Sequence, residues 1–229
     1  MLIHPNSFEI NFCKIKCIFH GSGAIYLPEN FTLIISDMHL EKSFSLNSKK
    51  NSGTFLPPYD TKDTLEKLNK VINIFKPKKI ISLGDSFHDK ISMLNISIKN
   101  KRLILQTFAN IECIWVTGNH DPILPEWLGG KIVNDYLIEN IIFRHISVNQ
   151  KYEISGHFHP KVKIKTKNKI LSSKCFIFND NRIIMPAFGS FTGGMFLNEI
   201  KNLLNNFDDF QIGFCYNDNI YRYPKSVML

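Results

Sequence analysis

Five short apolar runs, each ending in polar residues, constrain the fold of this chain more than any other feature. The runs cover residues 31–37, 78–85, 112–121, 140–145 and 152–160. Their length and β-branched content are typical of buried strands. A segment with one apolar face, 60–76, lies between the first two runs, and a lysine-rich segment follows at 96–110. The strands and these two predicted helices alternate, which indicates a layered α/β domain.

The last third of the chain has a different pattern. Segments 174–188 and 212–224 each place Asn-Asp-Asn between apolar stretches, which is typical of antiparallel hairpins and predicts mixed sheets. Residues 44–58, rich in Ser, Asn, Lys and Pro, predict a mobile loop near the first polar strand end. Because no repeat or linker divides the chain, residues 1–229 are predicted to form a single domain.

Charge and hydropathy narrow the class of protein. A net charge of +8 favours a polyanionic partner such as nucleic acid, although a lysine-rich composition can arise without any binding function. Five scattered cysteines predict reduced thiols. No apolar run reaches the roughly 18 residues of a membrane span. The first residues do not resemble a secretion signal, so we expect a cytoplasmic protein with no membrane partner.

Side chains that bind metals gather at the predicted strand ends. Six of the eight histidines are found there, namely His39, His88, His120, His145, His157 and His159. The carboxyl ends of neighbouring strands meet at one crevice, so these side chains are expected to converge. Asp37 and His39 are two residues apart in a segment predicted to be extended, so both should point the same way and hold one ion. The pair His157 and His159 repeats that spacing.

Asp37, Asp85 and Asn119 would add oxygen ligands to these imidazoles. A mixed nitrogen and oxygen set suits Mn, Fe or Zn better than the oxygen cage that Mg or Ca prefers. The set is too large for one structural zinc, whereas two ions that share a bridging carboxylate would use all of it. Any one of these residues alone is more often a hydrogen-bonded core or capping residue, so the prediction depends on their number and placement.

Five of these blocks, in this order, resemble the calcineurin-like metallophosphoesterases. They are Asp37-Met38-His39, Gly84-Asp85, Gly118-Asn119-His120-Asp121, His145 and Gly156-His157-Phe158-His159. The stretches SDMHLEK, PPYDTKDTL, LGDSFHD, GNHDP, SGHFHPKV and MPAFGSFTGG resemble the PdeM subfamily, the ligase-associated DNA-damage-response endonucleases. The resemblance covers residues 31–194 and implies a four-layer αββα sandwich with two mixed β-sheets.

The resemblance also implies a role for each site residue. It places Asp37, His39 and His159 on one ion, Asn119, His145 and His157 on a second ion, and Asp85 as the bridge. His120 would protonate the leaving oxygen, and Asp121 would orient His120. Two divalent ions, with Mn as the first choice and Fe, Zn or Mg as alternatives, would activate a bridging hydroxide that attacks a phosphodiester.

The implied function is that of a DNA endonuclease in DNA repair. A DNA ligase and a helicase are partners implied by the resemblance alone. One alternative is a phosphodiesterase that acts on a nucleotide or another small phosphodiester. A second alternative is a non-catalytic interaction module of the same fold, against which the complete ligand set argues.

The segment 84–89 departs from the broad family at one position. The family pattern is Gly-Asp-x-x-Asp, and His88 occupies the place of the last Asp. We expect His88 to orient the metal ligands by hydrogen bonding; contact with the substrate and direct metal binding are alternatives. Asp89 is predicted to cap a helix or to accept a hydrogen bond in a turn. Gly84 is predicted to permit a tight turn.

A basic segment follows the last histidine block. Its lysines occur at every second position: Lys161, Lys163, Lys165, Lys167 and Lys169. In a strand all five would lie on one face and could neutralise nucleic acid phosphates. The alternative is an edge strand whose lysines prevent aggregation. The glycine-rich segment 188–194 is predicted to close the site or to form a plain turn.

Overall fold

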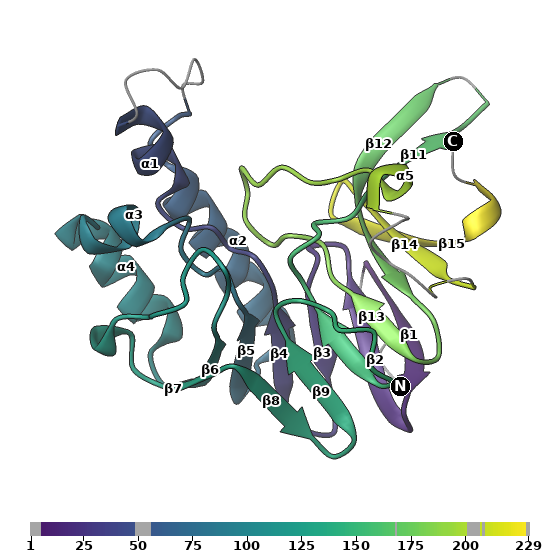
Figure 1. Cartoon of the computed structure of the whole chain (residues 1–229), viewed down its shortest axis with the longest axis horizontal. Helices are drawn as coiled ribbons and strands as arrows, with labels where there is room; N and C mark the ends of the chain where they lie inside the picture. Colours follow the sequence, from purple (N-terminus) through teal and green to yellow (C-terminus); the bar gives the residue numbers. More distant parts are fainter. Residues whose placement is uncertain (1–5, 49–55, 168, 201–206, 208, 228–229) are drawn as a thin grey trace.

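The computed structural model describes residues 6–48, 56–167, 169–200, 207 and 209–227, and its described strands form two sheets (Figure 1). The strands of the first sheet are β1 (Ser7–Phe12), β2 (Ile15–His20), β3 (Ile25–Leu27), β4 (Thr32–Ile35), β5 (Lys79–Leu83), β6 (Glu112–Val116) and β7 (Lys131–Val133). They lie in chain order. Strands β1 to β4 are antiparallel and β4 to β7 are parallel.

The second sheet has the order β15-β14-β12-β13-β10-β9-β8, with β11 paired to β12. Its strands are β8 (Asp135–Ile138), β9 (Ile141–Arg144), β10 (Glu153–Ser155), β11 (Lys161–Lys165), β12 (Ile170–Phe178), β13 (Arg182–Ile184), β14 (Gln211–Tyr216) and β15 (Asn219–Pro224). Strands β9, β10 and β13 are parallel, while β12–β13 and β14–β15 are antiparallel pairs. The predictions of mixed sheets and of two hairpins are confirmed.

Helices and short 3-10 turns connect these strands. They are α1 (Lys42–Ser48), α2 (Asp60–Phe75), α3 (Lys90–Leu94), α4 (Ile98–Phe108), α5 (Leu197–Ile200), η1 (Glu126–Leu128) and η2 (Lys225–Val227). The two helices predicted at 60–76 and 96–110 are confirmed as α2 and α4. Helix α2 ends at Phe75, and its C-cap Lys76 has a left-handed φ of 47°, just before Pro77. None of the described helices combines the length and apolar character needed to cross a membrane.

The prediction of a loop from residue 44 is wrong at its start, because α1 extends to Ser48. Tertiary hydrogen bonds stabilise this polar helix. The main-chain nitrogen of Ser43 donates to Asp60 Oδ2 at 3.1 Å, and the Ser45 hydroxyl donates to Asp89. Residues 49–55 of the predicted loop lie outside the described residues.

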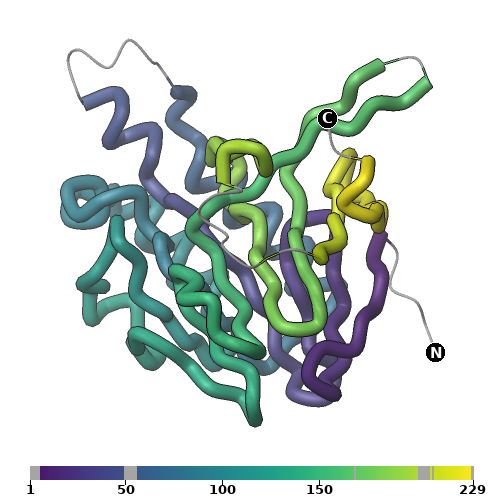
Figure 2. The backbone as a smooth tube through the Cα atoms, turned by 45° about the vertical axis from the view of Figure 1, so that its right-hand side comes forward, coloured from purple at the N-terminus to yellow at the C-terminus, as the bar shows by residue number. Residues whose placement is uncertain are grey.

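Three hydrophobic clusters define the layers. The first packs α2 and α4, through residues such as Leu68 and Ile104, on one face of the first sheet. The second fills the space between the two sheets with residues such as Phe19 and Phe176. The third covers the outer face of the second sheet beneath α5. This is the predicted αββα arrangement (Figures 1 and 2).

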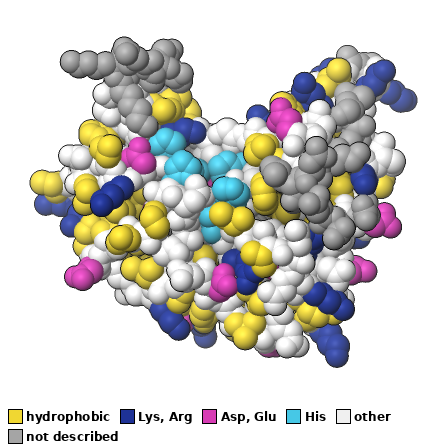
Figure 3. Space-filling model, in the orientation of Figure 1, with side chains coloured by type: hydrophobic (Ala, Val, Ile, Leu, Met, Phe, Trp, Pro, Cys, Tyr) yellow, Lys and Arg dark blue, Asp and Glu magenta, His cyan; other side chains and the backbone are white. Residues whose placement is uncertain are grey.

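The turns that follow β4, β5, β6, β9 and β10 meet at one rim of the sandwich. Main-chain hydrogen bonds join them: Asp37 N donates to Gly84 O at 3.2 Å, and Gly156 N donates to His145 O at 3.0 Å. Figure 3 shows histidines gathered in a hollow between the α1 side of the molecule and the β11–β12 hairpin. The fold therefore brings the polar strand ends together, as the sequence predicts.

Candidate metal centre

Two groups of potential metal ligands lie at this rim. The first group is Asp37, His39 and His159, and the second is Asp85, His145 and His157. Within each group the ligand atoms lie within 4.8 Å of one another. In the first, His159 Nε2 lies 3.0 Å from Asp37 Oδ1 and 3.3 Å from His39 Nε2. The resemblance to the metallophosphoesterases implies the same division, with Asp85 as the bridge between the two groups.

The second group is completed by Asn119. His145 Nε2 lies 2.9 Å from Asn119 Oδ1, 3.2 Å from His157 Nδ1 and 3.3 Å from Asp85 Oδ2. On its other side, His145 Nδ1 lies 2.8 Å from Leu83 O. A carbonyl oxygen only accepts, so Nδ1 carries a hydrogen, and in the neutral ring Nε2 would present its lone pair to the group.

Asp85 lies between the two groups. Its Oδ2 is 3.9 Å from His39 Nε2 and 3.3 Å from His145 Nε2, so one carboxylate oxygen faces both. The other oxygen, Oδ1, accepts from the main-chain nitrogen of His120 at 2.9 Å. Asp37 is held in the same way, because its Oδ2 accepts from His157 N at 3.0 Å. One oxygen of each buried carboxylate is therefore fixed by the main chain, and the other faces the imidazoles.

The ligand positions have an unusual backbone. Asp37, His39, Asp85, His157 and His159 have φ angles of 53°, 45°, 46°, 69° and 44°. Left-handed conformations cost a residue other than glycine about 1–3 kcal/mol each and cluster at functional sites. The premise that Asp37 and His39 point the same way along an extended segment is wrong, because β4 ends at Ile35. His157 and His159 do not share an ion site either, since the turn sends them to different groups.

Two glycines allow the turns to pack this closely. Gly84 has a φ of +79°, and a Cβ there would lie 2.5 Å from His145 Nδ1. A Cβ on Gly118 would collide with the Asp85 carboxylate. The prediction that Gly84 permits a tight turn is confirmed, and the close approach of His145 is a second reason for a glycine at this position.

The charges of these groups are strongly coupled. Burial lowers the pKa of His39 to about 3. Burial alone would also lower the pKa of His145, but its hydrogen bond to Asp85 and the charge of Asp37 raise that pKa to about 9. Burial alone would raise the pKa of Asp37, but the neighbouring imidazoles hold it well below its usual range. The buried carboxylates of Asp37 and Asp85 thus stabilise positive charge in the centre.

These residues fit a pair of divalent ions. Imidazole nitrogens face each other at 3.3 Å in the first group and 3.2 Å in the second, an arrangement that a shared cation explains directly. Both groups contain imidazole and carboxylate ligands, and Asn119 adds an amide oxygen to the second, which suits a transition metal ion or zinc. Bound ions would also replace the proton that the carboxylates favour on His145.

His120 lies at the open side of the centre. Its side chain is 41% exposed, and its Nε2 lies 4.0 Å from Asp85 Oδ2. Its Nδ1 is 2.8 Å from the main-chain oxygen of His88, so Nδ1 donates there and Nε2 faces the ligand groups. The rings of His88 and His120 stack with centroids 5.6 Å apart and an interplanar angle of 23°. His88 therefore positions His120 through both its backbone and its ring.

Asp121 has a different set of contacts from the one that the resemblance implies. Its Oδ1 accepts from Asp85 N and Gly118 N, and its Oδ2 accepts from Phe87 N, each at 3.0 Å. Burial raises the pKa of Asp121 to about 6. Among the described hydrogen bonds it is the His88 carbonyl, not Asp121, that orients the His120 ring. Asp121 instead fixes the turn that carries Asp85.

His88 and Asp89, the last two residues of the segment 84–89, have different kinds of contact. The rings of His88 and His39 have centroids 5.6 Å apart, and His39, His88 and His120 form a third group with metal-ligand spacing. Direct metal binding by His88 therefore stays open beside its positioning role. Asp89 is the N-cap of α3 and accepts from Ser92 N at 2.7 Å, which confirms its predicted structural role.

The predicted face of five lysines is shorter than expected. Strand β11 ends at Lys165, and hydrogen bonds from Thr166 to Lys169 O close a turn that contains Lys167. Within β11 the alternation holds, because Lys163 and Lys165 are exposed while Val162 and Ile164 are buried. Strand β11 lies at the edge of its sheet, so the alternative role of lysines in preventing aggregation remains open.

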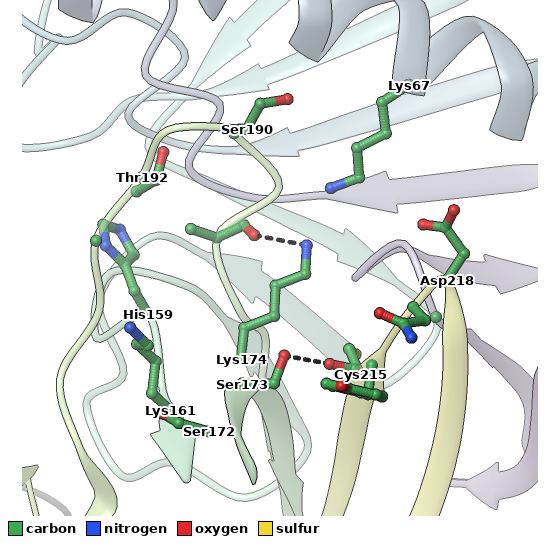
Figure 4. Close-up of a pocket in the computed structure, with 16 residues that line it drawn as sticks. Lys67, His159, Lys161, Ser172, Ser173, Lys174, Ser190, Thr192, Cys215 and Asp218 are labelled. Carbon is green, nitrogen blue, oxygen red and sulfur yellow. Dashed lines mark hydrogen bonds between the residues drawn. The ribbon is translucent and has the colours of Figure 1, made fainter. Parts of the chain in front are cut away.

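Sequence reasoning missed a polar cavity beside the centre. Its volume is about 520 Å³, and its wall includes His159, Lys67 and Lys174 (Figure 4). The glycine-rich segment 188–194 lies between this cavity and Asp37, since Gly189 lines the cavity and its main-chain nitrogen donates to Asp37 O at 3.1 Å. The sequence contained one indication of this cavity, because Lys67 lies on the apolar face of α2, between Thr64 and Val71, which are both buried.

Comparisons with known proteins agree with this geometry. The sequence model of the calcineurin-like phosphoesterases matches residues 32–221. Among solved structures, the crystal structure of Pseudomonas putida nuclease MPE is similar, with a TM-score of 0.72 over 95% of this chain and 100% of that chain. The two sequences are 19% identical, so this likeness concerns the fold, which confirms the predicted fold class. No curated protein matches the sequence. The chain belongs to the calcineurin-like phosphoesterase family, whose members hydrolyse phosphoesters with divalent metal ions.

Proposed function

We propose that this protein is a phosphodiesterase that cleaves DNA, acting as an endonuclease with two divalent metal ions. The observation that carries the proposal is the pair of ligand groups joined by Asp85, with His120 at their open side. A phosphodiester is anionic and repels hydroxide, so its hydrolysis needs positive charge at both the attacking and the leaving oxygen.

Each residue has a role in this proposal. One ion would be held by Asp37, His39 and His159, the other by Asn119, His145 and His157, and Asp85 would contact both. When bound, the ions would lower the pKa of a water molecule and stabilise charge on the phosphoryl oxygens.

His120 is proposed as the general acid. Its Nδ1 is anchored to His88 O, so its Nε2 is the atom that would give a proton to the leaving oxygen. Asp121 is proposed as a positioning residue that holds the Asp85 turn through three main-chain hydrogen bonds.

DNA is the substrate that the surface supports best. The net charge is +8, and the exposed lysines Lys163 and Lys165 lie on a hairpin that borders the hollow of the centre. These lysines, with Lys161, Lys167 and Lys169, are proposed to contact the phosphate backbone. The fold neighbour is named a nuclease. A role in DNA repair and partnership with a ligase and a helicase rest on the sequence resemblance to the PdeM subfamily. Manganese is proposed because of the mixed nitrogen and oxygen ligands, and a cytoplasmic location stays an expectation.

The test is an assay of metal-stripped protein reloaded with Mn, Mg or Zn. We expect cleavage of both labelled linear and labelled circular DNA with at least one metal, and Mn to be the most effective. Cleavage of linear DNA alone would replace the endonuclease proposal by an exonuclease. Hydrolysis of a small aryl phosphodiester without cleavage of any DNA would favour the small-substrate alternative. Inactivity on both substrates with every metal would contradict the hydrolase proposal.

A further inference from the structure

The cavity beside the metal centre is walled by residues from distant parts of the chain. Helix α2 supplies Lys67, strand β12 supplies Lys174, and the glycine-rich segment supplies Ser190 and Thr192 (Figure 4). His159, a residue of the first ligand group, forms part of the same wall. A molecule in the cavity would therefore lie next to a group bound at the metal centre.

Two lysine ammonium groups converge in this cavity. Lys67 Nζ donates to Phe188 O at 2.7 Å, and Lys174 Nζ donates to Ser22 O at 2.7 Å and to Ala187 O at 3.3 Å. These partners are main-chain carbonyl oxygens, which fix the ammonium groups without neutralising their charge. Each ammonium has three donor hydrogens; one of Lys67 and two of Lys174 go to these carbonyls, and a phosphate could take the hydrogens that remain in place of the contact between the two lysines.

The electrostatics of the cavity favour an anion. Burial, followed by the nearby Lys174, holds the pKa of Lys67 well below its usual range. Lys161 adds a third positive charge to the wall, and the carboxylate of Asp218 is the opposing charge. The hydroxyls of Ser190 and Thr192 add neutral hydrogen-bond donors. A bound phosphate would favour the charged form of Lys67, and Lys67, Lys174 and Lys161 would then face the phosphate with only the Asp218 carboxylate opposing them.

We propose that this cavity binds a second phosphate of the substrate, next along the chain from the phosphodiester at the metal centre. The proposal rests on the proposed phosphodiesterase activity and narrows it to substrates with more than one phosphate, such as a nucleic acid strand. A phosphodiester with a single phosphate would leave the cavity without its ligand.

The first test measures phosphate binding without catalysis. The protein is kept metal-free with a chelator, and its melting temperature is measured with inorganic phosphate and with chloride at equal ionic strength. We expect phosphate to stabilise the natural protein and this effect to be lost in Lys67→Gln and reduced in Lys161→Gln. Lys70→Gln, which removes an exposed charge from the same helix, is the matched control and should keep the effect. Equal stabilisation in all four proteins would overturn the proposal.

The second test compares matched substrates in the metal-loaded enzyme. One pair is thymidine 5′-(4-nitrophenyl phosphate) with and without a 3′-phosphate, and the other is the 3′-aryl ester with and without a 5′-phosphate. We expect kcat/KM to favour the second phosphate in one pair, and Lys67→Gln to reduce that preference about tenfold. Hydrolysis of both pairs without any preference would overturn the inference. If neither the aryl esters nor DNA is hydrolysed, the proposed function fails, and the phosphate-binding test still decides whether the cavity takes an anion.

Discussion

The metal centre and the basic hairpin β11–β12 lie side by side but are built in opposite ways. In the centre, Asp37 and Asp85 are buried, adopt left-handed backbone conformations and are fixed by main-chain hydrogen bonds. On the hairpin, Lys163 and Lys165 extend from an ordinary edge strand into solvent. The first region depends on geometry that the whole fold must hold, whereas the second depends on charge alone. A single substitution should therefore cause a large loss of activity in the centre, whereas substitutions on the hairpin should reduce DNA binding in small steps.

The largest effect is expected for Asp85→Asn. The amide keeps the shape of the side chain and can still accept from His120 N, but it removes the charge that both ligand groups face. We expect the bound metal content to fall and kcat to drop about a thousandfold or more. Metal analysis of the purified protein and turnover of an aryl phosphodiester measure the two effects. Full metal content with normal turnover would remove Asp85 from its place between the ions.

His120→Ala should separate catalysis from metal binding. His120 is half exposed and is anchored to His88 O, so its removal leaves both ligand groups intact. We expect kcat to fall about 10²- to 10⁴-fold while the metal content stays unchanged. A 4-nitrophenyl leaving group, which needs little protonation, should show the smaller loss, and an alkyl leaving group the larger one. Equal losses for both leaving groups would contradict the general-acid role.

Asp121→Asn tests the buried support of the centre. The carboxylate accepts three main-chain hydrogen bonds, and an amide presents only one oxygen for them. We expect the free energy of unfolding to fall by about 1–3 kcal/mol and the metal affinity by about 10- to 100-fold. Denaturant unfolding and metal titration measure these changes. If Asp121 instead acted only by orienting His120, kcat would fall while both quantities stayed at their natural values.

The sequence predicted the parts of the site that depend on local pattern. Apolar runs located the five strands, and the polar residues after them converge because the carboxyl ends of these strands meet at one rim. Helix α2 followed from its apolar face and from Pro77. The division of six residues into two groups, by contrast, came from the resemblance to the metallophosphoesterases and not from their spacing.

The parts that were missed depend on contacts between distant segments. Helix α1 is stabilised by Asp60 and Asp89, so its own polar composition indicates a loop. Strand β11 ends at Lys165 because of a turn closed by Thr166 and Lys169 O, which an alternating lysine pattern does not reveal. The contacts of Asp121 join the segments 84–89 and 118–121, and the cavity around Lys67 needs three or more segments to be in place. Local patterns carry no information on such contacts.

A moderate loss of DNA binding is expected for the double substitution Lys163→Glu and Lys165→Glu. Both side chains are exposed, so the fold should tolerate the change. DNA affinity should fall about tenfold or more at low salt. The slope of the logarithm of the affinity against the logarithm of the salt concentration should become shallower by about one unit per lysine. The matched control is Lys70→Glu with Lys131→Glu, which reverses two exposed charges away from β11. Equal losses on DNA and on a small aryl phosphodiester would show that the hairpin does not bind DNA.

The smallest effect is expected for His88→Asp, at the position where this chain departs from the broad family. The main-chain oxygen of His88 holds His120 Nδ1 whatever the side chain is, while the ring contacts with His120 and His39 are lost. We expect turnover to change about tenfold at most, with full metal content. The pH profile of kcat should shift, because a carboxylate would replace a ring that stacks on the proposed acid. Loss of metal in this variant would identify His88 as a ligand in the third group that it forms with His39 and His120.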